Sequence, residues 1–350
     1  MKLIRKTPFK NRLGLFDFYK GTLMILIVVF HHGNLWMAEV KDVNPSFIIL
    51  KASVVMASFF MISGYGFKAT DSKSCFHKQV KQMLEPYFWM MLACVLIVSL
   101  KNILKGRAVF AEARDYALGF LLVHTDGSVP VYQGIQPSTT GWFLVTLFLS
   151  WNLLNLLFHI KKEKLRHLAV AAVALLGMCL TLIPVWIWCL PQSLLATALL
   201  YAGYLIKEKK VFYHKIPKKF LLGLFLLWGV SLIFGAANMA ANTWKLGMLD
   251  FLGAIAGGIL LLKGYTYIEF PDVKATEIVM KIGRYTYWIM CLHGVSIGAL
   301  KFETYIRRLQ LAALPSLLLH IMADSIFIII GCILLQYIAG IKHKYQRRKK

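Results

Sequence analysis

The feature that most constrains this chain is a succession of apolar runs, each about 18–25 residues long, separated by short clusters of Lys and Arg. A helix of this length crosses the hydrocarbon core of a bilayer. The runs are continuous, whereas the strands of a membrane β-barrel alternate apolar and polar residues over about ten positions. We therefore expect an all-α polytopic membrane protein.

The composition excludes several other classes of protein. Of the 350 residues, 58% are hydrophobic and 16% are charged, whereas a soluble domain carries roughly 25% charged residues. A soluble globular enzyme, a disordered protein and a secreted disulfide scaffold do not fit these values. The six cysteines include no CxxC pair, so neither a zinc site nor a disulfide framework is indicated. We accordingly expect no bound metal.

The net charge of +24 has a different meaning here from that in a nucleic-acid-binding protein. Such proteins collect their basic residues on one folded surface. In this chain the basic residues lie in short segments between apolar runs, which is how membrane topology is encoded. We expect the lipid bilayer, and not nucleic acid, as the partner that this charge pattern reflects.

The apolar runs divide the chain into ten predicted spans within a single membrane domain that covers residues 1–350. The helical core extends over about 17–340 and is followed by a basic tail, 341–350. The predicted spans are 18–37, 46–67, 83–100, 141–160, 168–188, 190–206, 220–237, 248–267, 282–300 and 314–340.

The distribution of basic residues predicts the orientation. With the N-terminus inside, the inner segments hold 29 of the 40 Lys and Arg residues and the outer segments hold nine. Cytoplasmic loops carry the excess of Lys and Arg. Both termini are therefore expected in the cytoplasm, and the protein in the cell membrane as a multi-pass protein.

The first span carries ionisable residues, which are costly inside a bilayer and so suggest function. Lys20 and His31 are eleven residues apart, which on a helix is three turns plus roughly 20° and a rise of about 16 Å. They therefore share one face, and Asp17 can pair with Lys20. An ordinary explanation is also open: Lys20 could extend to the inner interface, and His31 and His32 could be interfacial residues.

This first span resembles the first helix of the membrane acyltransferase-3 family, whose pattern is D-x-x-[R/K]-G followed by His, here Asp17, Lys20, Gly21 and His31. Lysine in place of the usual arginine is similar to the branch related to fucose O-acetylases. Four further segments resemble the family in the same order: Phe59-Phe60-Met61-Ile62-Ser63-Gly64-Tyr65, Lys78-Gln79-Val80-Lys81 with Glu85-Pro86-Tyr87, Gly141-Trp142-Phe143-Leu144, and Gly283-Arg284-Tyr285-Thr286-Tyr287 ending in Leu292-His293.

The resemblance implies an O-acyltransferase that moves an acyl group, most often acetyl and alternatively succinyl, from cytoplasmic acyl-CoA to a hydroxyl of a cell-surface glycan or glycolipid precursor. Acyl-CoA would be a donor substrate, with no permanently bound cofactor. His31 would be the base, because the unperturbed pKa of histidine, about 6.5, is near neutrality. Lys20, Lys78, Lys81 and Arg284 would face the phosphates of the donor.

Asp17, Ser63, Trp142 and His293 are further candidate site residues by the same resemblance. Simpler explanations exist for several of these side chains. Ser63 lies beside Gly64 in a small-residue pair that suits helix packing, Lys78 and Lys81 suit an inner loop, and Trp142 suits an interfacial aromatic belt. His293 could simply bond a neighbouring helix, and Asp324 and Lys51 have no assigned role.

Two functions of other classes remain open from the sequence alone. A transporter or lipid-linked-sugar flippase would use the embedded Lys, His and Asp to line a path, although no inverted repeat is apparent. A catalytically silent assembly factor would tolerate substitution of His31. For an enzyme, the polar outer loop 125–140, which contains Asp126 and Ser128, is the expected route of the acceptor.

We predict that reporter fusions placed after Lys78, Lys164, Lys210 and the C-terminus all report a cytoplasmic location, because the inner segments hold most of the basic residues. The measurement is the ratio of a cytoplasmic to an external reporter at each site. An external signal at the C-terminus would contradict the ten-span arrangement.

Overall fold

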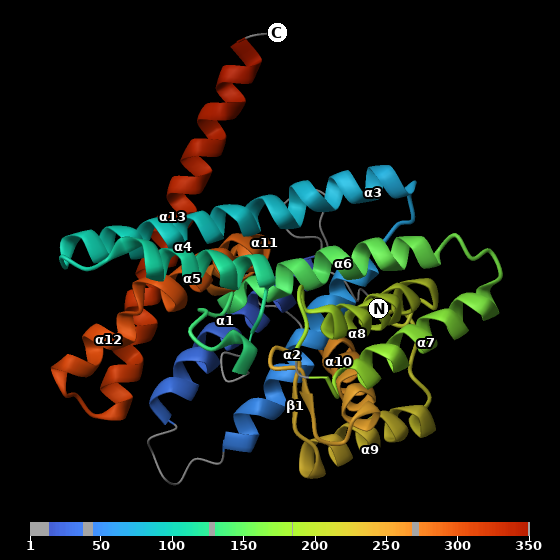
Figure 1. Ribbon diagram of the computed structural model, residues 1–350. Coiled ribbons are helices and arrows are strands. Elements are labelled where there is room, and N and C mark those ends of the chain that lie inside the picture. Colours follow the sequence, from blue (N-terminus) through green and yellow to red (C-terminus); the bar gives the residue numbers. More distant parts are fainter. Residues whose placement is uncertain (1–13, 38–44, 126–129, 184, 268–272, 349–350) are drawn as a thin grey trace.

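The computed structural model describes residues 14–37, 45–125, 130–183, 185–267 and 273–348, and nearly all of them are helical (Figure 1). The predicted all-α class is confirmed. In the part of the chain that the structure describes, extended structure is limited to one antiparallel hairpin of two short strands, β1 (Ala237–Asn238) and β2 (Thr243–Trp244). This hairpin connects two helices.

In chain order the helices are α1 (Gly14–Met37), α2 (Pro45–Tyr65), α3 (Ser72–Gln79), α4 (Glu85–Leu104), α5 (Val109–Leu122), α6 (Trp142–Leu157), α7 (Glu163–Leu180), α8 (Leu190–Glu208), α9 (Lys218–Phe234), α10 (Met248–Tyr265), α11 (Lys274–Val295), α12 (Phe302–Ile306) and α13 (Ala313–Arg348). Two π-helical turns, η1 (Val80–Leu84) and η4 (Ser296–Leu300), and three 3₁₀ turns, η2 (Pro130–Tyr132), η3 (Thr139–Gly141) and η5 (Arg307–Leu309), complete the list.

Five helical stretches in the described residues are long and apolar enough to cross a membrane: 14–33, 72–104, 139–157, 248–265 and 313–338. The last of them turns large apolar side chains outward, as a surface against lipid would: Leu314, Leu318, Met322, Ile326, Ile330 and Ile333. Each of the ten predicted spans overlaps a helix. The count of ten crossings and the orientation remain predictions.

Several predicted boundaries are wrong. The fifth predicted span, 168–188, corresponds to α7, which ends at Leu180. The residues before α8, Trp188 and Cys189, adopt left-handed φ angles of 59° and 50°, so the last part of this predicted span is not helical. The ninth, 282–300, begins earlier, at Lys274, and the predicted outer loop 101–140 contains α5. This helix packs along α4 because Tyr116 and Phe120 are buried (Figure 1).

The pairing of α1 with α11 is the most extensive helix contact in the molecule. The two helices run in the same direction, since Asp17 meets Arg284 near one end and His31 meets His293 near the other. The backbones touch at two glycines. A Cβ added at Gly283 would lie 1.7 Å from the carbonyl oxygen of Asp17, and one added at Gly21 would lie 2.0 Å from that of Val279. Such small residues allow close helix approach.

A second close contact holds α2 against α8. A Cβ at Gly64 would lie 1.8 Å from the carbonyl oxygen of Leu200, and one at Gly203 would lie 1.8 Å from that of Met61. The packing explanation for Gly64 is therefore correct. Ser63, one residue earlier, faces a different direction and lines a cavity that is described below.

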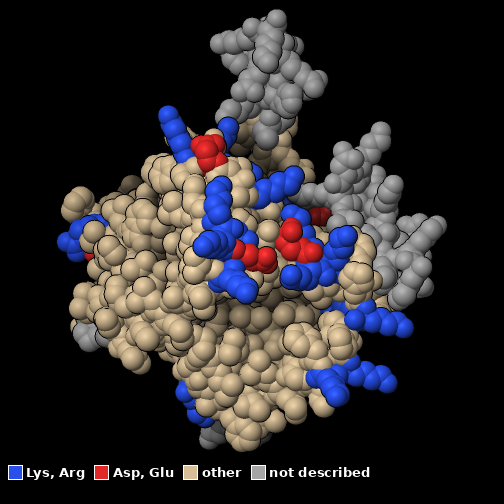
Figure 2. All heavy atoms as spheres, turned by 90° about the vertical axis from the view of Figure 1, so that its right-hand side faces the viewer, with Lys and Arg blue, Asp and Glu red and all other residues tan. Residues whose placement is uncertain are grey.

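Charged side chains gather on one face of the molecule. Figure 2 shows Lys and Arg concentrated on the face that carries the start of α3 and the connection between α6 and α7, whereas most of the remaining visible surface is uncharged. Lys68, Lys73, Lys161, Lys162 and Lys164 are exposed in these two segments. Both segments are predicted to be cytoplasmic.

We predict that Gly283→Ala destabilises the protein, because the new Cβ would overlap the Asp17 carbonyl and separate α1 from α11. Overpacking of this kind costs about 1–3 kcal/mol. The measurement is the melting temperature of the purified protein in detergent. Gly223→Ala is the matched control, since its Cβ would meet no atom within 4 Å and should leave the melting temperature unchanged or slightly raised. Equal melting temperatures for both variants would contradict the close contact.

Candidate active site

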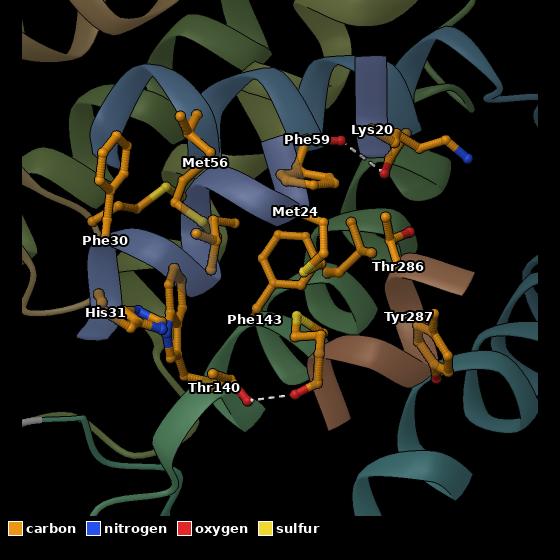
Figure 3. Close-up of a pocket in the computed structure, with 18 of the residues that line it drawn as sticks. Lys20, Met24, Phe30, His31, Met56, Phe59, Thr140, Phe143, Thr286 and Tyr287 are labelled. Atoms are coloured by element: carbon orange, nitrogen blue, oxygen red, sulfur yellow. Dashed lines mark hydrogen bonds between the residues drawn. The ribbon is translucent and has the colours of Figure 1, made fainter. Parts of the chain in front are cut away.

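A cavity of about 380 Å³ lies between α1, α2, α6 and α11, and both Lys20 and His31 line it (Figure 3). The two residues lie at opposite ends of the group of side chains drawn there, so the predicted shared face of α1 is present. Most of the wall between them is apolar, including Met24, Phe59 and Phe143. The cavity therefore offers a cation at one end, an imidazole at the other and an apolar passage between.

The lysine end of the cavity is organised by one carboxylate. Asp17 is buried, and its Oδ1 lies 3.5 Å from Nζ of Lys20 while its Oδ2 lies 3.2 Å from Nε of Arg284. The predicted pairing of Asp17 with Lys20 is confirmed. Sequence reasoning did not predict that Arg284 shares this carboxylate. Among the described residues, this one carboxylate therefore faces two cationic side chains at the end of the cavity.

Lys78 and Lys81, the other two predicted donor-side cations, are exposed on α3 and η1 and do not line the cavity. Met83, two residues after Lys81, does line it. The π-helical turn η1 is joined to α11 by the hydroxyl of Tyr287, which donates to the carbonyl of Gln82. Such turns are frequent at functional sites, and this one brings the two lysines near the cavity without placing them in it.

The histidine end is a hydrogen-bonded chain that leads from the cavity into the protein interior. Nδ1 of His31 lies 2.8 Å from Nε2 of His293, and Nδ1 of His293 lies 2.7 Å from Oδ2 of Asp324. His293 and Asp324 are fully buried, whereas His31 is exposed and faces the cavity. The two imidazole rings are nearly parallel, with an interplanar angle of 8°.

The chain of hydrogen bonds assigns the tautomers of both histidines. A carboxylate only accepts, so His293 donates from Nδ1–H to Asp324. Neutral His293 then carries its lone pair on Nε2 and accepts from Nδ1–H of His31. Nε2 of His31 therefore carries no proton. His31 lines the cavity. His31 is thus set up as a proton acceptor, and the charge of Asp324 lies two hydrogen bonds behind it.

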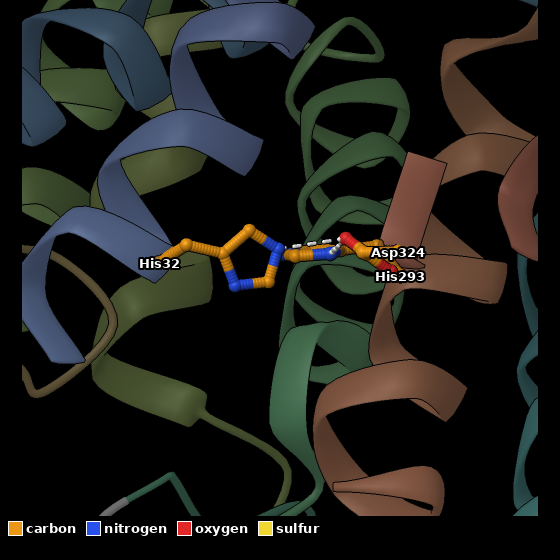
Figure 4. Close-up of side chains that lie close together, drawn as sticks. All are labelled: His32, His293 and Asp324. Atoms are coloured by element: carbon orange, nitrogen blue, oxygen red, sulfur yellow. Dashed lines mark hydrogen bonds and ion pairs between the residues drawn. The ribbon is translucent and has the colours of Figure 1, made fainter. Parts of the chain in front are cut away.

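His32 does not line the cavity, because the helical period places it about 120° from Lys20 around α1. Its Nε2 lies 2.9 Å from the same Oδ2 of Asp324, so this oxygen accepts from two histidines (Figure 4). The His32 ring packs 3.9 Å from the ring of His320, whose Nδ1 accepts a hydrogen bond from Nε1 of Trp36. Asp324, unexplained by the sequence, is therefore the centre of this cluster.

The same three ligand atoms, on His32, His293 and Asp324, lie within 4.8 Å of one another, and their types suit a metal ion such as zinc. The distances favour hydrogen bonds instead. Tetrahedral zinc with bonds of about 2.0–2.1 Å holds its ligand atoms about 3.4 Å apart, whereas Oδ2 of Asp324 lies 2.7 and 2.9 Å from the two ring nitrogens. Protons account for each of these contacts, so the geometry fits a proton chain better than a metal centre.

The remaining predicted site residues also reach the cavity. Trp142 is buried at the start of α6 and lines the cavity, so the aromatic-belt explanation for it is wrong. Ser63 lines the cavity as well, with its hydroxyl donating to the carbonyl of Phe59. Asn238, on the β1–β2 hairpin, is a lining residue that the sequence did not indicate. Asp126 and Ser128, in the predicted acceptor loop, lie outside the described residues.

Comparison with protein families shows to which family this chain belongs. The family model for the acyltransferase domain, acyltransferase 3, matches residues 14–338. The chain belongs to this family. A search of curated proteins finds no significant match. Because the match covers the helices that form the cavity and all of the histidine chain, this acyltransferase-3 protein is a membrane acyltransferase.

We predict that Asp324→Asn lowers kcat by about 10²–10⁴-fold, because the amide keeps the shape but removes the charge that fixes the tautomer of His293. The KM for the acyl donor should change little, since Asp324 does not line the cavity. The measurement is steady-state acyl transfer, normalised to folded protein.

The matched control is Asp250→Asn. Asp250 is an equally buried carboxylate in α10, bonded to Oγ of Ser231 and to the backbone of Leu246, and it does not line the cavity. This variant should lose stability and keep its kcat per folded molecule. If both variants lost kcat to the same extent, Asp324 would have only a structural role.

Proposed function

We propose that this protein is an O-acetyltransferase that moves acetyl from cytoplasmic acetyl-CoA to a hydroxyl of a cell-surface glycan or glycolipid precursor. One observation carries the proposal: a single cavity joins the cationic Lys20 end to His31, which is backed by His293 and Asp324. A long donor with phosphates at one end and a thioester at the other suits this arrangement. Succinyl-CoA is a donor of the same chemical design.

His31 is the general base in this proposal. The acceptor hydroxyl attacks the thioester carbonyl while its proton passes to Nε2 of His31. The carbon–sulfur bond of the tetrahedral intermediate then breaks, and Nε2–H returns the proton to the departing thiolate of CoA. The products are the acetyl ester and free CoA, and His31 is neutral again. While His31 is protonated, the nearby charge of Asp324 stabilises it.

The donor would bind with its phosphates at the Lys20 end. Lys20 and Arg284 are held there by Asp17, and the exposed Lys78 and Lys81 lie on segments that adjoin Met83 of the cavity wall. The pantetheine arm is slim and mostly uncharged, which suits the apolar wall. The predicted helical rise of about 16 Å between Lys20 and His31 would then separate the phosphate end from the thioester.

The acceptor would approach from the His31 end. Thr140, whose hydroxyl donates to the carbonyl of Met290, lies near His31 (Figure 3), and Asn238 on the hairpin is a further polar residue of the cavity lining. These groups suit a carbohydrate hydroxyl better than an apolar acceptor. In this arrangement the two substrates enter from opposite ends and meet at Nε2 of His31.

The test is transfer of labelled acetyl from acetyl-CoA to a base-labile ester by membranes that contain the protein. We predict that Lys20→Met raises the KM for acetyl-CoA about tenfold, equivalent to about 1.4 kcal/mol, because it removes a phosphate contact and leaves its apolar stem. Lys20→Arg keeps the charge and should stay near wild type.

Lys164→Met is the control, because it removes an exposed cation remote from the cavity. Its KM for acetyl-CoA should match that of the wild type. Wild-type kinetics for Lys20→Met would remove Lys20 from the donor site, and absence of label transfer by the wild-type protein with a full range of membrane glycan acceptors would refute acetyl transfer.

A further inference from the structure

A second pocket, of about 140 Å³, lies where the end of α4 and the start of α5 meet the segment from η4 to η5. It is separate from the cavity that contains His31, since the two have no lining residue in common. Among the described residues that line it, Glu112 is the only acidic one. Its basic lining residues are Lys101, Lys105, Arg107, Lys301 and Arg308.

The frame of the pocket is held by hydrogen bonds. Nζ of Lys101 donates to the carbonyls of Ala299 and Leu300, at 3.0 and 3.2 Å, where η4 ends. The Tyr116 hydroxyl donates to the carbonyl of Gly298 at 2.6 Å. These bonds tie α4 and α5 to the turn that follows His293, so the pocket is a fixed part of the helix bundle.

Aromatic rings position the cationic side chains. Lys101 and Arg308 lie 5.6 and 5.9 Å from the ring centre of Tyr305, within the range of cation–π attraction. Lys301 lies 5.7 Å from that of Tyr116. Lys301 also has a left-handed backbone with φ of 53°, a conformation for which glycine is better suited. The turn alone does not explain a lysine here, whereas a ligand for its ammonium group would.

The positive charge of the pocket is largely unbalanced. Glu112 is engaged by Nδ2 of Asn102 at 2.8 Å. Among the residues that the structure describes, neither Lys105 nor Arg107 forms an ion pair, and the same is true of Lys301 and Arg308. Like charges gathered without counter-charges repel one another, so an anionic ligand would relieve the repulsion.

The predicted topology makes this cluster more unusual. Outer segments are generally poor in Lys and Arg, and this chain has nine such residues in its predicted outer segments. Five of the nine line this one pocket. Topology therefore does not account for their presence, and a binding function does.

The pocket lies on the His31 side of the molecule. Arg307, adjacent to Arg308, packs 4.7 Å from the ring of Trp36, and Trp36 bonds His320 beside His32. The Lys20–Arg284 cluster is at the opposite end of α1 and α11. An anion bound in this pocket would therefore be distinct from the phosphates of a donor bound at Lys20.

We propose that this pocket binds a phosphate or pyrophosphate group of the acceptor, so that the sugar attached to it reaches His31. The assignment to the acceptor rests on the proposed acyl transfer, whereas the binding of the anion does not. Two sources share this chemistry: a polyprenyl-linked sugar anchored in the bilayer, and a soluble glycan phosphate.

The first experiment is calorimetric titration of inorganic pyrophosphate into the protein in phosphatidylcholine nanodiscs. We expect saturable binding that Arg107→Gln/Arg308→Gln weakens at least tenfold and that Arg107→Lys/Arg308→Lys largely retains. The control Lys161→Gln/Lys164→Gln removes two exposed cations from the face in Figure 2 and should change binding by less than twofold. Absence of saturable binding, or equal weakening in the control, would overturn the proposal.

A second set of measurements identifies the source and separates this site from the enzyme activity. Competition by polyprenyl pyrophosphate in the nanodisc, but not by glucose 1-phosphate, assigns a lipid-linked acceptor, and the reverse assigns a soluble one. Displacement of pyrophosphate by CoA would overturn the assignment to the acceptor. If pyrophosphate binds as expected but no acetyl is transferred, the anion site stands and the proposed reaction fails.

Discussion

The contact between α1 and α11 is the constraint on which the rest of the structure depends. Gly21 and Gly283 let the two backbones touch, and this closeness allows Asp17 to reach Arg284. The same pairing places His293 within hydrogen-bond distance of His31. Because both helices run in the same direction, the pair defines two chemically different ends, one cationic and one built from imidazoles. The cavity extends between these ends because other helices complete its walls without filling it.

The buried carboxylate of Asp324 shows why the histidines cluster around it. An ionisable side chain at mid-membrane costs about 2.5–3.5 kcal/mol on insertion scales, and the cost falls when the charge accepts strong hydrogen bonds. Both His293 and His32 bond Oδ2, so three helices contribute to a single charge. Removing one partner would leave a buried group unpaired. The network therefore fixes the rotation of α1 and α11 about their axes, and with it the direction in which His31 points.

The sequence allowed much of this site to be predicted, for physical reasons that apply to local features. The helical period alone placed Lys20 and His31 on one face, and the family resemblance indicated His293, whereas Asp324 had no assigned role. The sequence did not show that Asp324 bonds His32, because 292 residues separate the two and no local pattern encodes the contact. The sharing of Asp17 by Arg284 was missed for the same reason. Helix ends were the least predictable: α7 ends at Leu180 and α8 begins after left-handed residues at Trp188 and Cys189, and no local sequence pattern indicated either position.

The placement of charge also explains how one helix bundle could bring together two substrates that cannot reach each other through a bilayer. A phosphate group does not enter an apolar passage, so a phosphorylated donor held by Lys20 and Arg284 can extend only its uncharged arm toward His31. The second basic pocket, which shares none of the described lining residues of the cavity, would apply the same restriction from the other end in the proposed reaction. Each anion would then be held at its own end, and only the uncharged reacting groups would approach Nε2 of His31. In the proposed reaction the apolar wall between the ends, formed by residues such as Phe59 and Phe143, would be part of the chemistry, since it would keep ions out while it admits a thioester and a hydroxyl.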